Sequence, residues 1–153
     1  MSEPVGITTD GSDLFVCDSG NNAIRRVSLA DNSVSLLAGG AWGSADNDNG
    51  ALAQFNDPYG ITTDGTSLYV ADFYMVHGGV PIPGEPGSAA SLIRKIDLRT
   101  GALSTIAGID NTYGSLDNTV GTSASFRQPS GLTTDGVSLF AADRMNQTVR
   151  RIR

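Results

Sequence analysis

The chain carries one sequence pattern three times, and this repetition restricts its fold more than any other feature. Each copy opens with proline and closes on an Asp-Gly pair, at residues 4–11, 58–65 and 129–136. An apolar run ending in aspartate follows, at residues 14–18, 68–72 and 139–143. A short segment with a central basic pair comes next, at residues 24–27, 93–96 and 149–152. Repeats of this kind build stacked architectures, because one unit alone cannot bury its hydrophobic face.

The repeats predict β-strands rather than helices. The apolar runs are rich in aromatic and β-branched residues, which pack well on a pleated surface, and no segment shows a sustained apolar pattern of helical period. In the Asp-Gly pairs, glycine supplies the positive φ that a tight reversal between two strands needs. Two repeats add a fourth strand, at residues 34–39 and 103–108, and the third repeat does not. We therefore predict eleven strands.

Four antiparallel strands in a unit of about 40 to 55 residues are typical of a β-propeller blade. We predict an all-β fold of four-stranded antiparallel blades, with about three blades in a single domain of 153 residues. Blade 1 spans residues 4–39, and blade 2 spans residues 58–108 with an insertion at residues 73–92. Blade 3 spans residues 129–153 and lacks its outer strand.

The succession Pro-x-Gly-Ile-x-x-Asp-Gly, Leu-Tyr-Val-Ala-Asp, Ile-Arg-Lys-Ile and Ala-Gly in blade 2 resembles the NHL repeat. The linkers at residues 43–58 and 114–129 share a Gly-Ser-x-Asp start and an Ala-x-Phe end, and resemble inter-blade segments of bacterial members. The resemblance covers residues 4–153 and implies a propeller. It says less about function, because NHL-type propellers include protein-binding, RNA-binding, carbohydrate-associated and enzymatic modules. From the bacterial resemblance we expect an extracellular or cell-surface location.

The number of blades raises the question of assembly. Closed rings of this family commonly have six blades, whereas this chain holds just under three. Two copies related by a two-fold axis would complete six blades through heterologous contacts, and we predict this homodimer. The alternative is a piece of a longer chain, which the stop one strand short of a full third blade favours. We also expect a secreted parent to begin with a signal peptide, and residues 1–3 lead directly into the first strand.

Composition narrows the classes of function. Ten Lys and Arg against sixteen Asp and Glu give a net charge of -6, which disfavours binding to nucleic acid and anionic lipid. No apolar run approaches the roughly 18 residues of a membrane helix, so we expect no membrane contact. One histidine excludes a multi-histidine zinc site within one chain, and one cysteine excludes an internal disulfide. We expect no cofactor, apart from the calcium ion considered below.

In an up-and-down blade, the short turns lie at one end and the remaining connections at the other. The long segments, at residues 39–57, 108–128 and after Asp72, therefore share one end, which we call the long-loop face. Function concentrates on long loops carried by a rigid scaffold. We predict ligand-binding residues there, namely Trp42, Tyr74, His77 and Tyr113, since exposed aromatic rings suit protein or sugar recognition. The alternatives are that the rings cap the space between blades and that the histidine is a solvated loop residue.

Carboxylates on the same face suggest two further sites. Asp46 and Asp48 resemble the start of a calcium loop, because oxygens at i and i+2 can converge on a hard cation. The twelfth position of such a loop is Asp57 and not glutamate, so an ordinary turn is the alternative. With Asp110 and Asp117, the same residues would be the channel carboxylates of a metal-assisted lyase or hydrolase.

The basic pairs at residues 25–26, 94–95 and 150–151 would form the positive face of an RNA-binding domain. Their recurrence at one strand position favours packing against the aspartate that ends the preceding strand, namely Asp18, Asp72 and Asp143. We therefore predict a non-catalytic binding or scaffolding module that recognises a protein, carbohydrate or small ligand on its long-loop face. A propeller enzyme is the alternative, and an RNA-binding domain is the third possibility.

Overall fold

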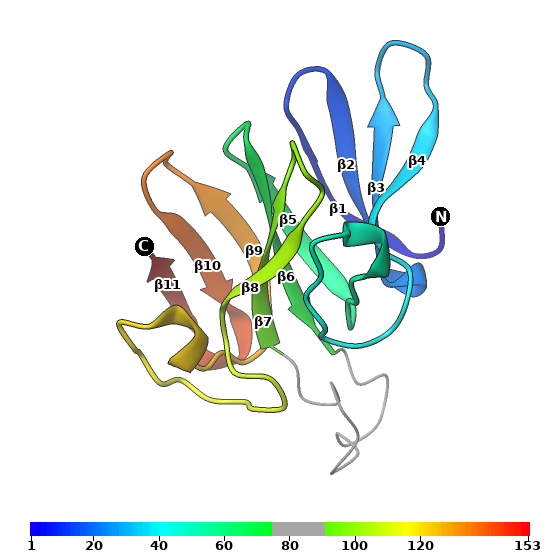
Figure 1. Ribbon diagram of the computed structural model, residues 1–153. Coiled ribbons are helices and arrows are strands. Elements are labelled where there is room, and N and C mark those ends of the chain that lie inside the picture. Colours follow the sequence, from blue (N-terminus) through cyan, green and yellow to red (C-terminus); the bar gives the residue numbers. More distant parts are fainter. Residues whose placement is uncertain (75–90) are drawn as a thin grey trace.

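The computed structural model describes residues 1–74 and 91–153 and contains three antiparallel sheets there (Figure 1). The first sheet consists of β1 (Pro4–Thr9), β2 (Asp13–Asp18), β3 (Ala23–Ser28) and β4 (Val34–Gly39). The second consists of β5 (Pro58–Thr63), β6 (Ser67–Phe73), β7 (Ser91–Asp97) and β8 (Leu103–Ala107), and the third of β9 (Pro129–Thr134), β10 (Leu139–Asp143) and β11 (Thr148–Ile152). Strands that follow one another in the chain are neighbours in each sheet. The predicted β-propeller segment of about three blades is confirmed.

Helical structure is confined to short 3-10 turns in the described residues. These are η1 (Ser19–Asn21), η2 (Gly50–Leu52), η3 (Gly121–Ser123) and η4 (Arg144–Asn146). Within residues 1–74 and 91–153, no helix is long and apolar enough to cross a bilayer.

The strands of blade 2 extend into the segment predicted as an insertion. Phe73 is the last residue of β6 and pairs with Ser91, the first residue of β7. Residues 73, 91 and 92 of the predicted insertion therefore belong to strands. The loop itself, residues 75–90, lies outside the described residues.

The hairpin turns repeat in detail. In blade 1, Gly11 has a φ of +93°, and the Asp10 carboxylate accepts hydrogen bonds from the amides of Ser12 and Asp13, each at 2.8 Å. The glycines at the equivalent turns, Gly65 and Gly136, have φ of +87° and +86°. The predicted reversals at the Asp-Gly pairs are therefore confirmed, and they lie at the end of the sheets opposite the long connections (Figure 1).

The hydrophobic core lies between the blades. Phe15 and Ile24 of blade 1 pack in one cluster with Leu68 and Val70 of blade 2. A second cluster joins blade 2 to blade 3 and contains Ala71, Ile93, Ala107, Leu139 and Ala141. Successive residues of β6 contribute to opposite clusters, so both faces of the middle sheet are buried. This explains why the strand is apolar without alternation.

Two glycines allow the first strands of neighbouring blades to approach closely. A Cβ on Gly6 would lie 2.2 Å from the carbonyl oxygen of Tyr59, and a Cβ on Gly60 would lie 2.2 Å from that of Ser130. The third glycine of the series, Gly131, has the Cβ of Ala142 as its nearest atom, at 3.7 Å. The backbones therefore approach closely at both contacts between neighbouring blades in the described residues.

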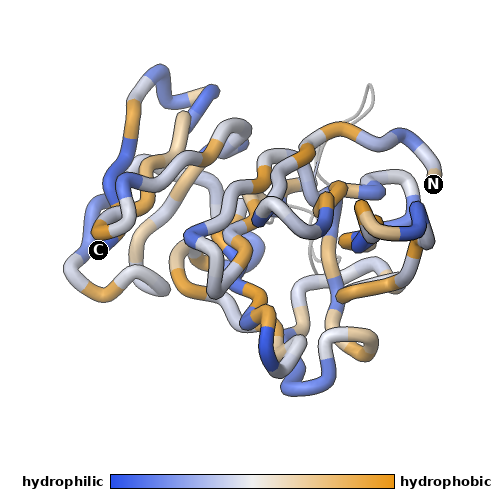
Figure 2. Tube along the Cα trace, turned by 90° about the horizontal axis from the view of Figure 1, so that it is seen from above, coloured by the Kyte–Doolittle hydropathy of each residue, from blue (hydrophilic) through white to orange (hydrophobic). Residues whose placement is uncertain are grey.

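The three blades form an open arc. The two chain ends lie on opposite sides of the molecule in two perpendicular views (Figures 1 and 2). Ile7 on the outer side of blade 1 is 60% exposed, whereas its counterpart in blade 2, Ile61, is 8% exposed. On the outer side of blade 3, Val149 is 74% exposed, whereas its counterpart Ile93 is fully buried. The outermost sheet faces thus expose positions that the inner interfaces bury.

Candidate functional site

The two inter-blade linkers, taken here as residues 39–57 and 108–128, have the same fold, and from Trp42 and Tyr113 onward their residues correspond at a constant offset. Trp42 forms a parallel bridge with Phe55, and Tyr113 forms the equivalent bridge with Phe126. In the first linker, the amide of Gly43 donates to the carbonyl of Phe55 at 3.0 Å, and Gly114 repeats this contact with Phe126 at 3.1 Å. These contacts therefore join the two ends of each linker segment, and an aromatic residue, Trp42 or Tyr113, lies at its first position.

A buried arginine holds the first linker against blade 2. Arg94 lies in β7, directly after a β-bulge in its pairing with β8, and a bulge of this kind redirects a side chain. Its guanidinium bonds the carboxylates of Asp72 and Asp46, each at 2.9 Å, and stands 5.3 Å from the ring centroid of Phe55. It also donates to two linker carbonyls, those of Gln54 and Ala45. We call this set of contacts the arginine anchor.

Blade 3 repeats the arginine anchor. Arg150 bonds Asp143 at 3.1 Å, forms an ion pair with Asp117 and lies 4.7 Å from the ring centroid of Phe126. In blade 1, Arg25 bonds Asp18 at 2.8 Å. The predicted pairing of each basic segment with the aspartate that ends the preceding strand is confirmed in all three blades. The first arginine of each pair therefore serves packing.

Burial and hydrogen bonding shift the pKa of the anchor carboxylates in different directions. Burial raises the pKa of Asp72 to about 6, although Arg94 and the amides of Asn56 and Asp57 oppose this shift. Burial also acts on Asp18, but the hydrogen bonds from Arg25 and other donors outweigh it and lower the pKa of that carboxyl.

Three of the four predicted ligand-binding residues lie in the described part of the chain. The Trp42 and Tyr74 rings meet edge to face, with centroids 6.4 Å apart and an interplanar angle of 78°. Trp42 is 42% exposed. Tyr113 is half-buried, and burial raises the pKa of its hydroxyl, with a further contribution from Tyr74 that Arg127 opposes. His77 lies outside the described residues.

These contacts connect the two linkers on the long-loop face. Trp42 comes from the first linker, Tyr113 from the second, and Tyr74 follows the end of β6 between them. Ser44 of the first linker donates to Asp110 of the second at 2.7 Å. The hydroxyl of Tyr113 is buried without a hydrogen-bond partner. The result is a partly exposed aromatic surface with polar groups beside it.

The predicted calcium residues have other partners or remain exposed. Both carboxylate oxygens of Asp46 accept hydrogen bonds, one from the amide of Thr105 at 2.9 Å and the other from Arg94 and the Thr105 hydroxyl. Asp48 is exposed. Residues 1–74 and 91–153 contain no group of three potential metal ligands. A cation at Asp46 would compete with its arginine, and the calcium site stays a prediction.

The carboxylates of the enzyme alternative do not gather at one point in the described residues. Asp46 and Asp117 belong to different arginine anchors, and Asp110 accepts from Ser44. Sequence reasoning missed the anchor role of the two linker aspartates. The signal was present, because Asp46 and Asp117 recur in the Gly-Ser-x-Asp motif as regularly as the arginines recur in the strands.

Comparison with known proteins places this geometry in a family. No family model matches the chain. Human NHL repeat-containing protein 2 is 30% identical over 166 residues, and its bovine counterpart is 31% identical over the same length. Both alignments cover 98% of this chain. The chain belongs to the NHL-repeat family. It spans about a fifth of the length of these curated NHL relatives, since the alignments cover 20% of each.

Solved structures agree on the NHL-like propeller fold. A structural genomics protein of unknown function from Bacteroides thetaiotaomicron superposes with a TM-score of 0.73 at 19% identity, over 92% of this chain and 32% of that chain. An auxiliary nutrient binding protein from Bacteroides ovatus superposes with a TM-score of 0.69 at 20% identity, over 94% of this chain and 35% of that chain. At such identities the likeness shows the fold alone.

Proposed function

We propose that this NHL-repeat segment is a non-catalytic binding module, and that its long-loop face recognises a carbohydrate or a protein. The observation that carries the proposal is the edge-to-face pair of Trp42 and Tyr74, which joins two separate segments at a partly exposed surface. Aromatic rings provide large, rigid contact area at low entropic cost. They suit the apolar face of a sugar ring as well as apolar protein side chains.

The surrounding scaffold supports this role. Each linker is tied to a blade by a buried or nearly buried arginine with several partners, so the aromatic residues stand on a fixed base. Recognition sites lose less entropy on binding when they are held in place before the ligand arrives. The name of the Bacteroides ovatus neighbour, an auxiliary nutrient binding protein, is consistent with binding as a use of this fold.

Tryptophan fluorescence tests the proposal directly, because Trp42 is the single tryptophan of the chain. We would titrate the protein with a panel of oligosaccharides and with immobilised peptides, and follow Trp42 emission. A saturable emission change with one ligand class supports the proposal. Absence of saturable binding across both classes at millimolar concentration would overturn it.

Two variants distinguish a ligand-binding site at Trp42 from a general effect of substitution on the protein. Tyr74→Ala removes the partner ring of Trp42 and should weaken binding about tenfold, since an aromatic contact contributes on the order of 1 kcal/mol beyond its buried area. Val137→Ala is the matched control, because Val137 is an exposed apolar residue in a hairpin turn at the opposite end. Equal losses in both variants would contradict a site at Trp42.

We also propose that a second copy of the chain covers the two open sheet faces. The supporting observation is that Ile7 and Val149 are exposed where their counterparts Ile61 and Ile93 are buried between blades. The outer face of blade 3 would then meet the outer face of blade 1 in the partner, as a heterologous contact. Light scattering over a range of concentrations tests this. A persistent mass of 15.8 kDa would refute the dimer, and twice that mass would support it.

A further inference from the structure

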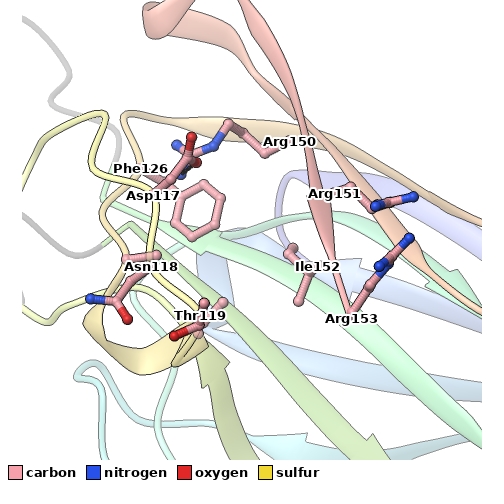
Figure 3. A pocket seen from close by; sticks show the side chains of 11 residues that line it. Asp117, Asn118, Thr119, Phe126, Arg150, Arg151, Ile152 and Arg153 are labelled. Carbon is pink, nitrogen blue, oxygen red and sulfur yellow. Dashed lines mark ion pairs between the residues drawn. The ribbon is translucent and has the colours of Figure 1, made fainter.

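Arg127 is an exposed residue of the long-loop face, at the point where the second linker enters blade 3. Tyr113 forms its parallel bridge with Phe126, the residue directly before Arg127. In Figure 3 the Phe126 ring lies beside Arg150 and Asp117, and the guanidinium of Arg150 is 4.7 Å from the ring centroid. The arginine anchor of blade 3 therefore holds the segment that carries Arg127 next to the aromatic residues of the candidate site.

The backbone of Arg127 is fixed on both sides. Its amide donates to the Asp143 carboxylate at 2.8 Å, and its carbonyl accepts from the amide of Met145 at 3.1 Å. The amide of the next residue, Gln128, donates to the hydroxyl of Ser91 in blade 2 at 3.3 Å. The Arg127 side chain thus starts from a fixed base between two blades, and a residue held in this way loses less entropy when a ligand binds.

The positive charge of Arg127 is not neutralised within the described residues. Unlike the arginines of the anchors, Arg127 has no ion-pair partner among residues 1–74 and 91–153. Burial raises the pKa of the neighbouring Tyr113, so that hydroxyl stays protonated at neutral pH and supplies no negative charge. The chain as a whole has a net charge of -6. It therefore disfavours densely charged anions, whereas one guanidinium suits a ligand with isolated carboxylates.

The first linker shows that the scaffold does not require a cation at this position. Asn56 follows Phe55 there, as Arg127 follows Phe126, and the backbone amides of Asn56 and Arg127 both donate to a strand-ending aspartate. The Asn56 side chain is 1% exposed, whereas Arg127 is exposed. The two positions share a backbone role and differ in the side chain, so the guanidinium of Arg127 is available to a ligand.

The cation and the aromatic pair of the candidate site are neighbours. Trp42 and Tyr74 meet edge to face, and both Tyr74 and Arg127 lie close enough to the Tyr113 hydroxyl to influence its ionisation. The apolar face of a sugar ring packs on aromatic side chains, and a guanidinium binds a carboxylate through two parallel hydrogen bonds. A uronic acid carries both groups. Its carboxylate is attached directly to the ring, so it loses less rotamer entropy than the glutamate of a peptide.

We propose that the long-loop face binds an oligosaccharide containing uronic acid, with a sugar ring on the pair of Trp42 and Tyr74 and a carboxylate on Arg127. This inference rests on the proposed function of the face and narrows its ligand class. The probes are tetragalacturonate, a hyaluronan tetrasaccharide and a xylotriose with one glucuronic acid branch, each with its carboxyl methyl ester as the neutral counterpart. Calorimetry and Trp42 emission give the affinities.

We expect at least one of these acids to bind saturably, and its ester to bind about tenfold more weakly, because charge-assisted hydrogen bonds are stronger than neutral ones. The side-chain Nε–H signal of Arg127 should shift on binding of the acid. Absence of saturable binding by all three acids at millimolar concentration, or equal affinities of acid and ester, overturns the inference.

Arg127→Gln removes the charge and should abolish the preference for acid over ester while leaving the affinity for the ester unchanged. Arg99→Gln is the matched control, because Arg99 is an exposed arginine in the turn between β7 and β8, at the opposite end of the blade. It should retain the full preference, and thermal unfolding checks that both variants are folded. Equal losses of preference in the two variants would indicate a general charge effect and contradict a site at Arg127.

The results also separate this inference from the proposed function. If neutral sugars or peptides bind saturably at Trp42 and a carboxylate adds nothing, the binding module stands and the uronic acid inference is wrong. If a capped glutamate-rich peptide binds through Arg127 and none of the acidic oligosaccharides does, the cation serves a protein ligand, which also overturns the inference. Absence of binding by every sugar and peptide contradicts both proposals.

Discussion

Replacement of Arg94 by methionine should lower the free energy of unfolding more than most single changes at the contact between the first linker and blade 2. Methionine fills much of the same space but leaves the Asp72 carboxylate, which is fully buried, without its ion-pair partner. Loss of one member of a buried pair costs about 3–5 kcal/mol. Domains of this size are stable by roughly 5–15 kcal/mol, so Arg94→Met removes a large share of the total.

Arg25→Met is the matched control, because Arg25 occupies the same repeat position in blade 1 but its side chain is 27% exposed. A partly exposed pair contributes up to about 1 kcal/mol. Urea unfolding at pH 7 gives both free energies. The burial argument is wrong if the two variants lose the same stability, or if Arg94→Met costs less than about 1 kcal/mol.

A double-mutant cycle guards against a variant that is too unstable to measure. Asp72→Asn removes the buried charge, and Asp72→Asn combined with Arg94→Met should be more stable than the sum of the single losses predicts.

The stability of Arg94→Met should also depend on pH with a defined sign. Burial already raises the pKa of Asp72 to about 6, above the value of the unfolded chain. The protonated form therefore favours folding, and the stability of Arg94→Met should fall as pH rises from about 4 through 6.

Two further predictions use other matched positions. Gly60→Ala should strongly destabilise the protein, because the added Cβ would lie 2.2 Å from the Ser130 carbonyl oxygen. Gly131→Ala should be tolerated, because the nearest atom to its added Cβ is 3.7 Å away. Equal melting temperatures of the two variants would contradict the close approach. The Tyr69 hydroxyl donates to Asp64 at 2.8 Å. Burial and this carboxylate raise the pKa of Tyr69 to about 12. The hydrogen bonds that Asp64 accepts outweigh its burial and lower the pKa of Asp64 to about 2. The stability that Tyr69 adds over Tyr69→Phe should therefore be present between pH 4 and 10, and should fade below about 4 and above about 10; thermal unfolding across this range measures it.

The sequence predicts most of the fold because the same local signals occur three times. A single Asp-Gly pair or a single apolar run is a weak signal, but three concordant copies fix the order of strands and turns. The pairing of Asp72 with Arg94 was predictable for the same reason. The ends of the strands that flank the insertion in blade 2 were harder to predict, because nothing in the composition of residues 73–92 shows that Phe73 pairs with Ser91.

The candidate site was predicted in part, because its contacts depend on how distant segments meet. The comparable positions of Trp42 and Tyr113 are visible in the aligned linkers. That Tyr74 reaches Trp42 depends on how the first linker folds over the end of β6. The carboxylate at position 46 illustrates the limit of local patterns. The spacing of Asp46 and Asp48 suggests a cation, yet the structure pairs Asp46 with an arginine 48 residues away in sequence.

The repeats also separate residues that the scaffold requires from residues that are free to serve a ligand. Each blade interface needs its arginine, its strand-ending aspartate and its close glycine, and these recur. Positions at which the repeats carry different residues are not required by every blade in this way. Such positions include Trp42 against Tyr113, and Asn56 against Arg127. Asn56 is buried, and neither polar atom of its side chain has a hydrogen-bond partner. A side chain as buried as that of Asn56 cannot touch a ligand directly, whereas Trp42 is exposed. Binding specificity should therefore be sought at the exposed positions where the repeats differ, and not in the shared anchors.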